Sequence, residues 1–351
     1  MERKEWIRRL SSLMSVTGYE DYQSDKLREM TDGLFDEYRV DALKNQVFIK
    51  RCGRENAPKI LVDAHFDEIG MYVSDIKKGG FLTVANVGGL DTRILEGAPV
   101  MIYGKEVIAG IISAIPASKR SEKEKDQLKK IDQLQIDTCY TEEKLRELVR
   151  VGTPVGYYGL YTDLGAHQMA GKGFDDKACA ACIIEAISAL SPEELAGDVY
   201  VLLSAHEETD RLGGVFTGAY AIDPDYAMVI DVNLGKTPDT KTSETVKMGG
   251  GASITFSAVT DKKLTRMLCD LAEKKGIAYQ RCVSAESTGT NATSLALVRD
   301  GVPTVDVGLP LKSMHTYNEV LDLRDAEAVS LLVRAFVTDG ELAETFGRES
   351  E

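Results

Sequence analysis

The sequence lacks the features that mark several large classes of protein. No apolar run approaches the roughly 18 residues that a membrane-spanning helix needs. Basic residues are scarce, since 42 Lys and Arg stand against 56 Asp and Glu, which gives a net charge of −14. Nucleic-acid binding and docking on anionic membranes both depend on a basic surface. We therefore expect neither nucleic acids nor membranes among the partners.

Cysteine is sparse as well, with six residues in a chain of 351. Residues 1–20 lack the apolar core of about 7–15 residues that a secretory signal carries, because charged residues interrupt their apolar positions. The cysteines are therefore expected to be free thiols in the cytoplasm rather than a disulfide framework. Cys179 and Cys182 form a C-x-x-C pair on the apolar stripe of a predicted helix, and we expect them to pack as small hydrophobic side chains.

Strand-like and helix-like segments alternate in the first 69 residues and again after residue 160. Buried strands are predicted from four apolar runs, at residues 59–62, 199–203, 226–230 and 304–307. Helices are predicted from amphipathic patterns at residues 5–14, 21–34, 177–190, 264–275 and 324–336. This alternation is typical of an α/β fold in which helices cover both faces of a mostly parallel sheet.

The middle of the chain has a different pattern. Short β-like runs occur at residues 81–87, 99–103 and 107–112, and Gly104-Lys105 forms a plausible hairpin turn between the last two. The charge-rich stretch 118–130 is expected to be a solvated loop or helix face. These features favour a separate β-rich domain.

The two patterns together predict a two-domain chain. The α/β domain is expected to be discontinuous, formed by residues 1–69 and 161–351. The β-rich domain is expected to be inserted in it, over residues 70–160. The glycine run at 249–251 is not followed by Lys and Ser or Thr, so it is predicted to be a turn rather than a phosphate-binding loop.

Histidine and acidic residues follow several of the predicted strands. His65 stands at the end of the first strand, and Asp67 projects to the same side if the segment stays extended. From there Asp67 can accept the second imidazole N–H and fix the tautomer of a metal-binding histidine. The other polar residues in comparable places are Asp175, Glu207, Glu208, Asp231 and His315.

Each of these residues also has an ordinary structural explanation. His65 can be a satisfied structural histidine, and Asp175 can be a helix cap. Glu207 and Glu208 can be exposed loop acids, and Asp231 can be a turn former. Taken one at a time, they do not establish a site.

Taken together, the set indicates a metal centre. All of these residues fall at or just beyond the carboxyl ends of predicted strands or in the loops that follow, which lie along one edge of a parallel sheet. Two imidazoles and at least three carboxylates suit one or two ions of zinc, cobalt or manganese, and suit calcium or a thiolate-only zinc site poorly. Two ions about 3.5–4 Å apart commonly hydrolyse amides. The adjacent pair Glu207-Glu208 argues against a glycosidase, whose carboxylates flank a sugar from opposite sides.

Seven short motifs occur in order along the chain. They are Thr17-Gly18-Tyr19-Glu20, Ala64-His65-Phe66-Asp67-Glu68-Ile69-Gly70, Val87-Gly88-Gly89, Phe174-Asp175-Asp176-Lys177-Ala178, His206-Glu207-Glu208, Ile230-Asp231-Val232 and Met314-His315-Thr316. Their order and spacing resemble the glutamyl aminopeptidase family, the tetrahedral-aminopeptidase or "cellulase M"-like dinuclear metallopeptidases. The resemblance extends over nearly the whole chain.

The resemblance implies a three-layer α/β/α zinc-peptidase-like catalytic domain with an inserted, PDZ-like β-domain used in assembly. It implies a homo-oligomer, from a dimer up to a tetrahedral dodecamer. It further implies that Asp175 bridges two divalent metal ions, which are zinc, cobalt or manganese. The remaining ligands implied are His65 and Asp231 for one ion, and Glu208 and His315 for the other.

The family's activity is implied in the same way. We expect a metal-dependent aminopeptidase that removes N-terminal residues from short peptides. A metal-bridged water is the implied nucleophile, and Glu207 is the implied general base, which takes a proton from that water and returns it to the leaving amine. Asp67 is implied to orient His65. The Asp175–Asp176 peptide bond is expected to be cis.

The chain also departs from the family pattern. Residues 209–214 differ from the usual Val-Gly-Leu-Arg-Gly, Asn291 stands where Asp is usual, and Lys312-Ser313 replaces Arg-Tyr. None of these changes removes a ligand or the base, so they bear on substrate preference and oligomer form. A related metal-dependent deacylase or carboxypeptidase, and a non-catalytic assembly or binding paralogue, are the alternatives.

Overall fold

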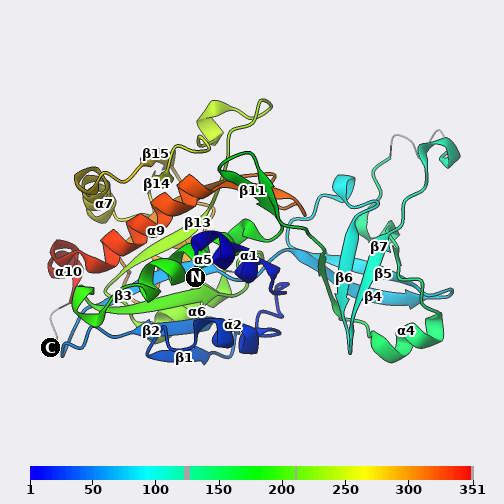
Figure 1. Ribbon diagram of the computed structural model, residues 1–351, viewed down its shortest axis with the longest axis horizontal. Coiled ribbons are helices and arrows are strands. Elements are labelled where there is room, and N and C mark those ends of the chain that lie inside the picture. Colours follow the sequence, from blue (N-terminus) through cyan, green and yellow to red (C-terminus); the bar gives the residue numbers. More distant parts are fainter. Residues whose placement is uncertain (122–126, 210–211, 349–351) are drawn as a thin grey trace.

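The computed structural model describes residues 1–121, 127–209 and 212–348. Within them the chain forms a large region built on one sheet and a smaller β-barrel beside it (Figure 1). The predicted charged stretch 118–130 lies partly outside the described residues. Among the helices of the described part, none combines the length and apolar character needed to cross a membrane.

The large region is organised around four central strands. These are β12 (Asp198–Ser204), β3 (Lys59–His65), β13 (Tyr226–Leu234) and β16 (Thr304–Lys312), and neighbours in this order pair in parallel. All four are almost entirely buried, which explains why they stand out in the sequence as continuous apolar runs. Their carboxyl ends meet at one edge of the sheet, where the predicted site residues cluster.

The outer strands make the sheet mixed, so the expectation of a mostly parallel sheet is wrong. Within the described residues it has 11 strands, and most pairs outside the centre are antiparallel, as short hairpins add strands at the edges. Only β14 and β15 form another parallel pair there. The outer strands are β1 (Glu37–Val40), β2 (Gln46–Lys50), β10 (Thr162–Leu164), β11 (Gln168–Gly171), β14 (Ala252–Ser257), β15 (Tyr279–Ser284) and β17 (Glu319–Asp322).

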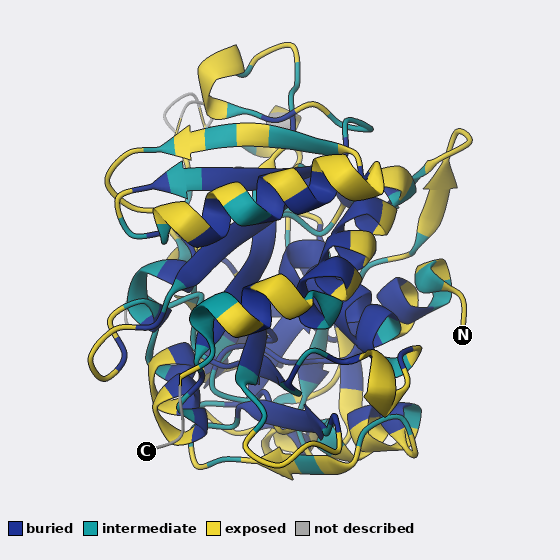
Figure 2. Cartoon of the chain, turned by 90° about the vertical axis from the view of Figure 1, so that its left-hand side faces the viewer, coloured by how far each residue is buried: buried dark blue, intermediate teal, exposed yellow. Residues whose placement is uncertain are grey.

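Helices cover both faces of this sheet, which gives the three-layer α/β/α arrangement that was predicted. One face is covered by α1 (Arg3–Ser12), α5 (Phe174–Ser188), α7 (Lys262–Lys275) and α9 (Leu323–Thr338). The other is covered by α6 (Gly213–Ile222) and α8 (Ala292–Leu295). The shorter helices α2 (Ser24–Thr31) and α10 (Gly340–Phe346) add to the first layer. Figure 2 shows buried strands between helices whose outer faces are exposed.

The helices form where the sequence supplies both an apolar face and end signals. In α7, Asp261 accepts a hydrogen bond from the Leu264 N–H, and Gly276 ends the helix in the left-handed region at φ 65°. Helix α5 is different, because nearly all of it is buried. Cys179 and Cys182 lie there with no exposed surface, which confirms that they pack as small hydrophobic side chains.

The smaller region is a closed barrel with its own hydrophobic core. Its strands, in order around the barrel, are β4 (Gly70–Lys77), β5 (Phe81–Val87), β8 (Ile136–Asp137), β7 (Val107–Ile112), β6 (Pro99–Tyr103) and β9 (Pro154–Tyr157). Helix α4 (Glu142–Leu148) packs against β4. The predicted hairpin at Gly104-Lys105 joins β6 to β7. Apolar side chains such as Leu82 and Val100 fill the interior.

Two predicted site residues sit differently from expectation. Asp231 lies inside β13 rather than at its end, because that strand continues to Leu234 in register with β16. Asp175 follows β11, which is antiparallel to its neighbours, so the rule for parallel strands does not place it. It reaches the same edge because α5 begins there and packs along β3 and β13.

Candidate metal centre

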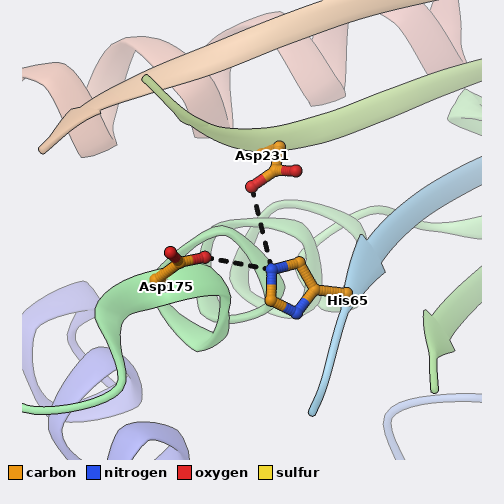
Figure 3. A group of neighbouring side chains, drawn as sticks. All are labelled: His65, Asp175 and Asp231. Atoms are coloured by element: carbon orange, nitrogen blue, oxygen red, sulfur yellow. Dashed lines mark hydrogen bonds and ion pairs between the residues drawn. The ribbon is translucent and has the colours of Figure 1, made fainter. Parts of the chain in front are cut away.

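Three of the predicted residues form a first group of potential metal ligands. His65 is the last residue of β3, Asp231 lies on neighbouring β13, and Asp175 is at the start of α5. His65 Nε2 lies 3.0 Å from Asp175 Oδ1 and 3.8 Å from Asp231 Oδ1 (Figure 3). All three residues are buried, and one ligand atom from each lies within 4.8 Å of the others.

A second group shares Asp175 with the first. His315 Nε2 lies 3.3 Å from Asp175 Oδ2 and 3.3 Å from Glu208 Oε1. One ligand atom from each of these residues again lies within 4.8 Å of the others. The two carboxylate oxygens of Asp175 therefore face different histidines. This is the geometry that a bridging carboxylate requires.

Asp67 holds the turn that carries the two glutamates. Its carboxylate accepts hydrogen bonds from the Glu207 N–H at 3.0 Å and the Glu208 N–H at 3.1 Å, and from the Thr17 hydroxyl at 2.8 Å. His65 Nδ1 lies 3.0 Å from the backbone oxygen of Asp67 and 3.5 Å from its carboxylate. Asp67 thus contacts the imidazole mainly through its main chain, while its side chain fixes the Glu207-Glu208 turn. This second role of Asp67 was not predicted, because the two N–H groups that donate to its carboxylate lie 140 and 141 residues further along the chain.

The adjacent glutamates point to different partners. Glu208 faces His315, whereas Glu207 Oε2 lies 4.0 Å from His65 Nε2 and belongs to neither group of three. Burial raises the pKa of Glu207 to about 7, and the nearby carboxylates add to that shift against the opposing effect of His65. A carboxyl group with a pKa in this range is suited to accept and return a proton near neutral pH.

The electrostatics of the cluster favour a bound cation. Burial raises the pKa of Glu208, and it raises the pKa of Asp231 well above the usual value. Burial acts to raise the pKa of Asp175 too, but hydrogen bonds with His315 and His65 lower it. Hydrogen bonds to Asp175 and Glu208 raise the pKa of His315 to about 11. Several buried or half-buried acids thus lie beside two imidazoles, and divalent ions would offset the concentrated negative charge. The oxygen and nitrogen donors present fit such ions.

The barrel approaches this site through the motif Val87-Gly88-Gly89, which lies at the end of β5. A Cβ atom added to Gly89 would lie 3.1 Å from His315 Nδ1, and one added to Gly88 would lie 3.4 Å from the Glu208 backbone oxygen. The loop after β5 therefore closely approaches the second group of potential metal ligands. A side chain at Gly89 would require His315 to shift by a few tenths of an ångström.

Two further residues lie beneath the site. Asn291, one of the departures from the family pattern, donates hydrogen bonds to Asp63 Oδ2 at 2.9 Å and Ser204 Oγ at 2.8 Å, so it joins β3 to β12. Glu319 accepts hydrogen bonds from main-chain N–H groups of the two segments that carry Asp175 and His315. No sequence motif marks Glu319, so it is not among the predicted site residues. The departure from the family pattern at residues 209–214 falls partly outside the described residues. The Asp175–Asp176 peptide bond is cis, as expected.

Comparisons with known proteins identify the family to which the chain belongs. Residues 45–332 match the sequence profile of the M42 glutamyl aminopeptidase family. A lysyl aminopeptidase from Pyrococcus furiosus is 29% identical over 341 residues, which cover 95% of this chain and 96% of that protein. The structure of an aminopeptidase from the archaeon Desulfurococcus kamchatkensis has a TM-score of 0.88 at 29% identity, with 98% of each chain covered.

A third comparison concerns assembly. The Pyrococcus horikoshii TET1 peptidase, described as able to assemble into a tetrahedron or a large octahedral shell, has a TM-score of 0.83 at 29% identity, covering 96% of this chain and all of that one. Such relatives support a homo-oligomeric state. The profile match spans most of the sequence, and the residues that could hold metal lie together in space. The chain is a peptidase and belongs to the M42 glutamyl aminopeptidase family.

Proposed function

We propose that this chain is a two-metal aminopeptidase that removes N-terminal residues from short peptides. The observation that carries the proposal is the position of Asp175, whose two oxygens face His65 and His315. Each of the two groups then offers one imidazole and two carboxylates, whose ligand atoms lie within 4.8 Å of one another. The family and its aminopeptidase members supply the class of reaction.

Five residues would hold the two ions, which we propose to be zinc, cobalt or manganese. His65 and Asp231 would hold one ion, Glu208 and His315 the other, and Asp175 would bridge them. When bound, such ions lower the pKa of a coordinated water and stabilise negative charge on the carbonyl oxygen of the peptide.

Glu207 is proposed as the general base. It lies beside the cluster without belonging to either ligand group, so its carboxylate is free to take a proton from the attacking water. The same carboxyl group then gives that proton to the leaving amine. The hydrogen bond from the Glu207 N–H to Asp67 fixes the main chain of the base, which keeps its side chain aimed at the site.

The experiment that tests this proposal combines metal analysis with kinetics. Elemental analysis of the purified chain should find about two divalent ions, and hydrolysis of aminoacyl-p-nitroanilides should stop on chelation and return with zinc, cobalt or manganese. Glu207→Gln should retain the ions and lose about 10²–10⁴-fold in kcat, because it removes the base but no ligand. Full activity in Glu207→Gln would contradict the assignment of the base.

A substrate panel separates the remaining candidates. An aminopeptidase requires a free N-terminal amine, so N-acetylated peptides should be inert. Cleavage of N-blocked peptides or release of C-terminal residues would point to a deacylase or a carboxypeptidase with the same metal core. An absence of bound metal under every condition would favour a non-catalytic protein instead.

The barrel is proposed to be an assembly domain, inserted over residues 70–160 into a catalytic domain of residues 1–69 and 161–351. All six barrel strands lie within the proposed insert. On β7 the outward positions Val107, Ala109 and Ile111 are all exposed and apolar, although outward positions of a free barrel strand are usually polar. We propose that a second copy of the chain covers this face, in a cytoplasmic homo-oligomer.

Substitution of the β7 face tests this idea. Ile111→Asp should reduce the molar mass measured by light scattering, with little effect on barrel stability because the side chain is 55% exposed. Lys105→Asp in the neighbouring turn, also an exposed position, serves as the matched control. An unchanged mass for Ile111→Asp would exclude this face as an interface.

A further inference from the structure

One buried carboxylate connects the two segments that supply the second group of ligands. Glu319 is the first residue of β17 and is 2% exposed. Its Oε2 accepts hydrogen bonds from the Phe174 N–H at 2.6 Å and the Asp175 N–H at 3.2 Å. Its Oε1 accepts a hydrogen bond from the His315 N–H at 3.1 Å. The two ends of one side chain thus hold main-chain atoms that lie 140 residues apart in the sequence.

Both segments need an acceptor from outside their own secondary structure. Asp175 is at the start of α5 with a non-helical ψ of 106°, and the first N–H groups of a helix have no partner within it. His315 has a left-handed φ of 61° in the loop between β16 and β17. A buried N–H without a partner is costly, so the carboxylate stabilises the conformation that each segment adopts here.

We infer that Glu319 is a positioning residue for the proposed metal centre, since it sets where Asp175 and His315 stand relative to each other. This inference rests on the proposed function. A helix cap alone would occupy only the end of Glu319 that faces α5. The other end binds His315, which is not part of that helix, so the side chain acts on the distance between the two ligands.

The chemistry of a carboxylate explains why this position holds Glu. Three N–H donors approach from two sides, and only a group with an acceptor oxygen at each end can receive them all. An amide has one acceptor end and one donor end. In Glu319→Gln the carbonyl oxygen would remain with the two N–H groups at Phe174 and Asp175, and the NH₂ group would then face the His315 N–H.

The test is metal binding by the metal-free full-length chain, measured with Co²⁺ by calorimetry and by visible absorption. Wild type should bind two ions. In Glu319→Gln the ion held with His315 should bind about 10–100-fold more weakly, which is the usual effect of removing a group that orients a ligand. The ion held by His65, Asp231 and Asp175 should keep its affinity within about threefold. The remaining side-chain carbonyl oxygen still accepts a hydrogen bond from the Asp175 N–H, and the other two ligands do not contact Glu319.

A matched variant separates positioning from general loss of stability. Asp325 is also fully buried, and its carboxylate accepts hydrogen bonds from the Gly249 N–H and the Gly251 N–H, both at 2.7 Å. Asp325→Asn makes the same chemical change away from the ligands, so it should bind both ions as wild type does. Glu319→Asp retains two acceptor oxygens on a shorter side chain, and it should recover part of the lost affinity.

Each outcome of the experiment has a distinct meaning. Two ions bound to Glu319→Gln with wild-type affinities would overturn the inference while leaving the proposed function intact. Equal losses of both ions in Glu319→Gln and Asp325→Asn, matched by equal drops in melting temperature, would reduce Glu319 to a stabilising residue. A wild type that binds no metal would overturn the proposed function itself.

Discussion

The two regions of the molecule bury polar groups in opposite ways. Among the described residues of the barrel, over 70–160, the buried polar groups on side chains are the hydroxyls of Thr83, Thr138, Thr153 and Tyr157, and none is an acid. The sheet region buries many charged residues, and most of the acids lie at or below the site. The buried acids of the sheet region are Glu20, Asp63, Asp67, Glu68, Asp175, Asp176, Asp231, Asp306, Glu319, Asp322 and Asp325.

This difference distinguishes burial that only stabilises a region from burial that also serves a functional site. Burying an ionised group is costly unless it is paired or hydrogen-bonded, so a region that needs only stability has no reason to retain such groups. The barrel follows that rule with an apolar core. The sheet region retains several of its acids at the proposed metal centre. Main-chain N–H groups donate hydrogen bonds to Asp67 and Glu319, and two lysines pair with Glu68. Three variants, compared by their effect on catalysis, test this contrast.

The largest effect is expected from Asp175→Asn. Asp175 contributes to both ligand groups, so the variant should lose most of its metal and about 10³-fold or more in activity, because metal stabilisation of the transition state contributes several kcal/mol. Elemental analysis and kinetics check this directly. Asp163→Asn, at an exposed position on β10, should behave as wild type. Retention of both ions in Asp175→Asn would contradict the proposal that Asp175 bridges them.

An intermediate effect is expected where the barrel meets the site. Gly89→Ala would place a methyl group 3.1 Å from His315 Nδ1, so that the imidazole must shift by a few tenths of an ångström. We expect about a tenfold loss of kcat/KM, since small displacements of reacting groups carry large kinetic costs. Gly156→Ala is the matched control in the barrel, because its new methyl group would have no neighbour closer than 3.5 Å. Equal activity in the two variants would show that the loop does not constrain His315.

The smallest effect on catalysis is expected from the barrel core. Leu82→Ala removes a fully buried side chain and should lower the free energy of unfolding of the barrel by about 2–5 kcal/mol. Metal content and kcat should stay within about twofold of wild type at temperatures where the barrel remains folded. Chemical denaturation followed by separate probes in the two regions measures the first quantity. A loss of metal in parallel with barrel unfolding would show that metal binding in the sheet region depends on the barrel core.

The sequence predicted elements well where apolar residues are continuous or alternate along a strand. The strand predicted at 199–203 appears as Asp198–Ser204, and the barrel strands at 81–87, 99–103 and 107–112 have the predicted bounds. Alternating or continuous apolar patterns carry this information locally. The pairing of the outer strands was predicted wrongly, since whether neighbours run parallel or antiparallel depends on connections that hydropathy does not specify.

The candidate site was predictable to the extent that motifs carry it. The ligand groups around His65 and His315 contain residues that the resemblance had indicated, and the structure brings them together. The supporting contacts were not predictable. Glu319 reaches main-chain atoms rather than side chains, and such a contact leaves no residue pattern in its partners. Asp67 likewise binds backbone groups 140 and 141 residues away.

The approach of Gly89 to His315 has a consequence for exchanging parts between relatives. The barrel is closed and has its own core, so it has the properties of a transplantable module. Yet its β5 loop forms one wall of the cluster around His315. A chimera that carries a foreign barrel should fold, but it should keep catalysis only if residues 87–90 come from the same chain as the sheet. In this chain, the residues that shape the candidate site therefore include a loop of the barrel, so the site extends beyond the sheet region.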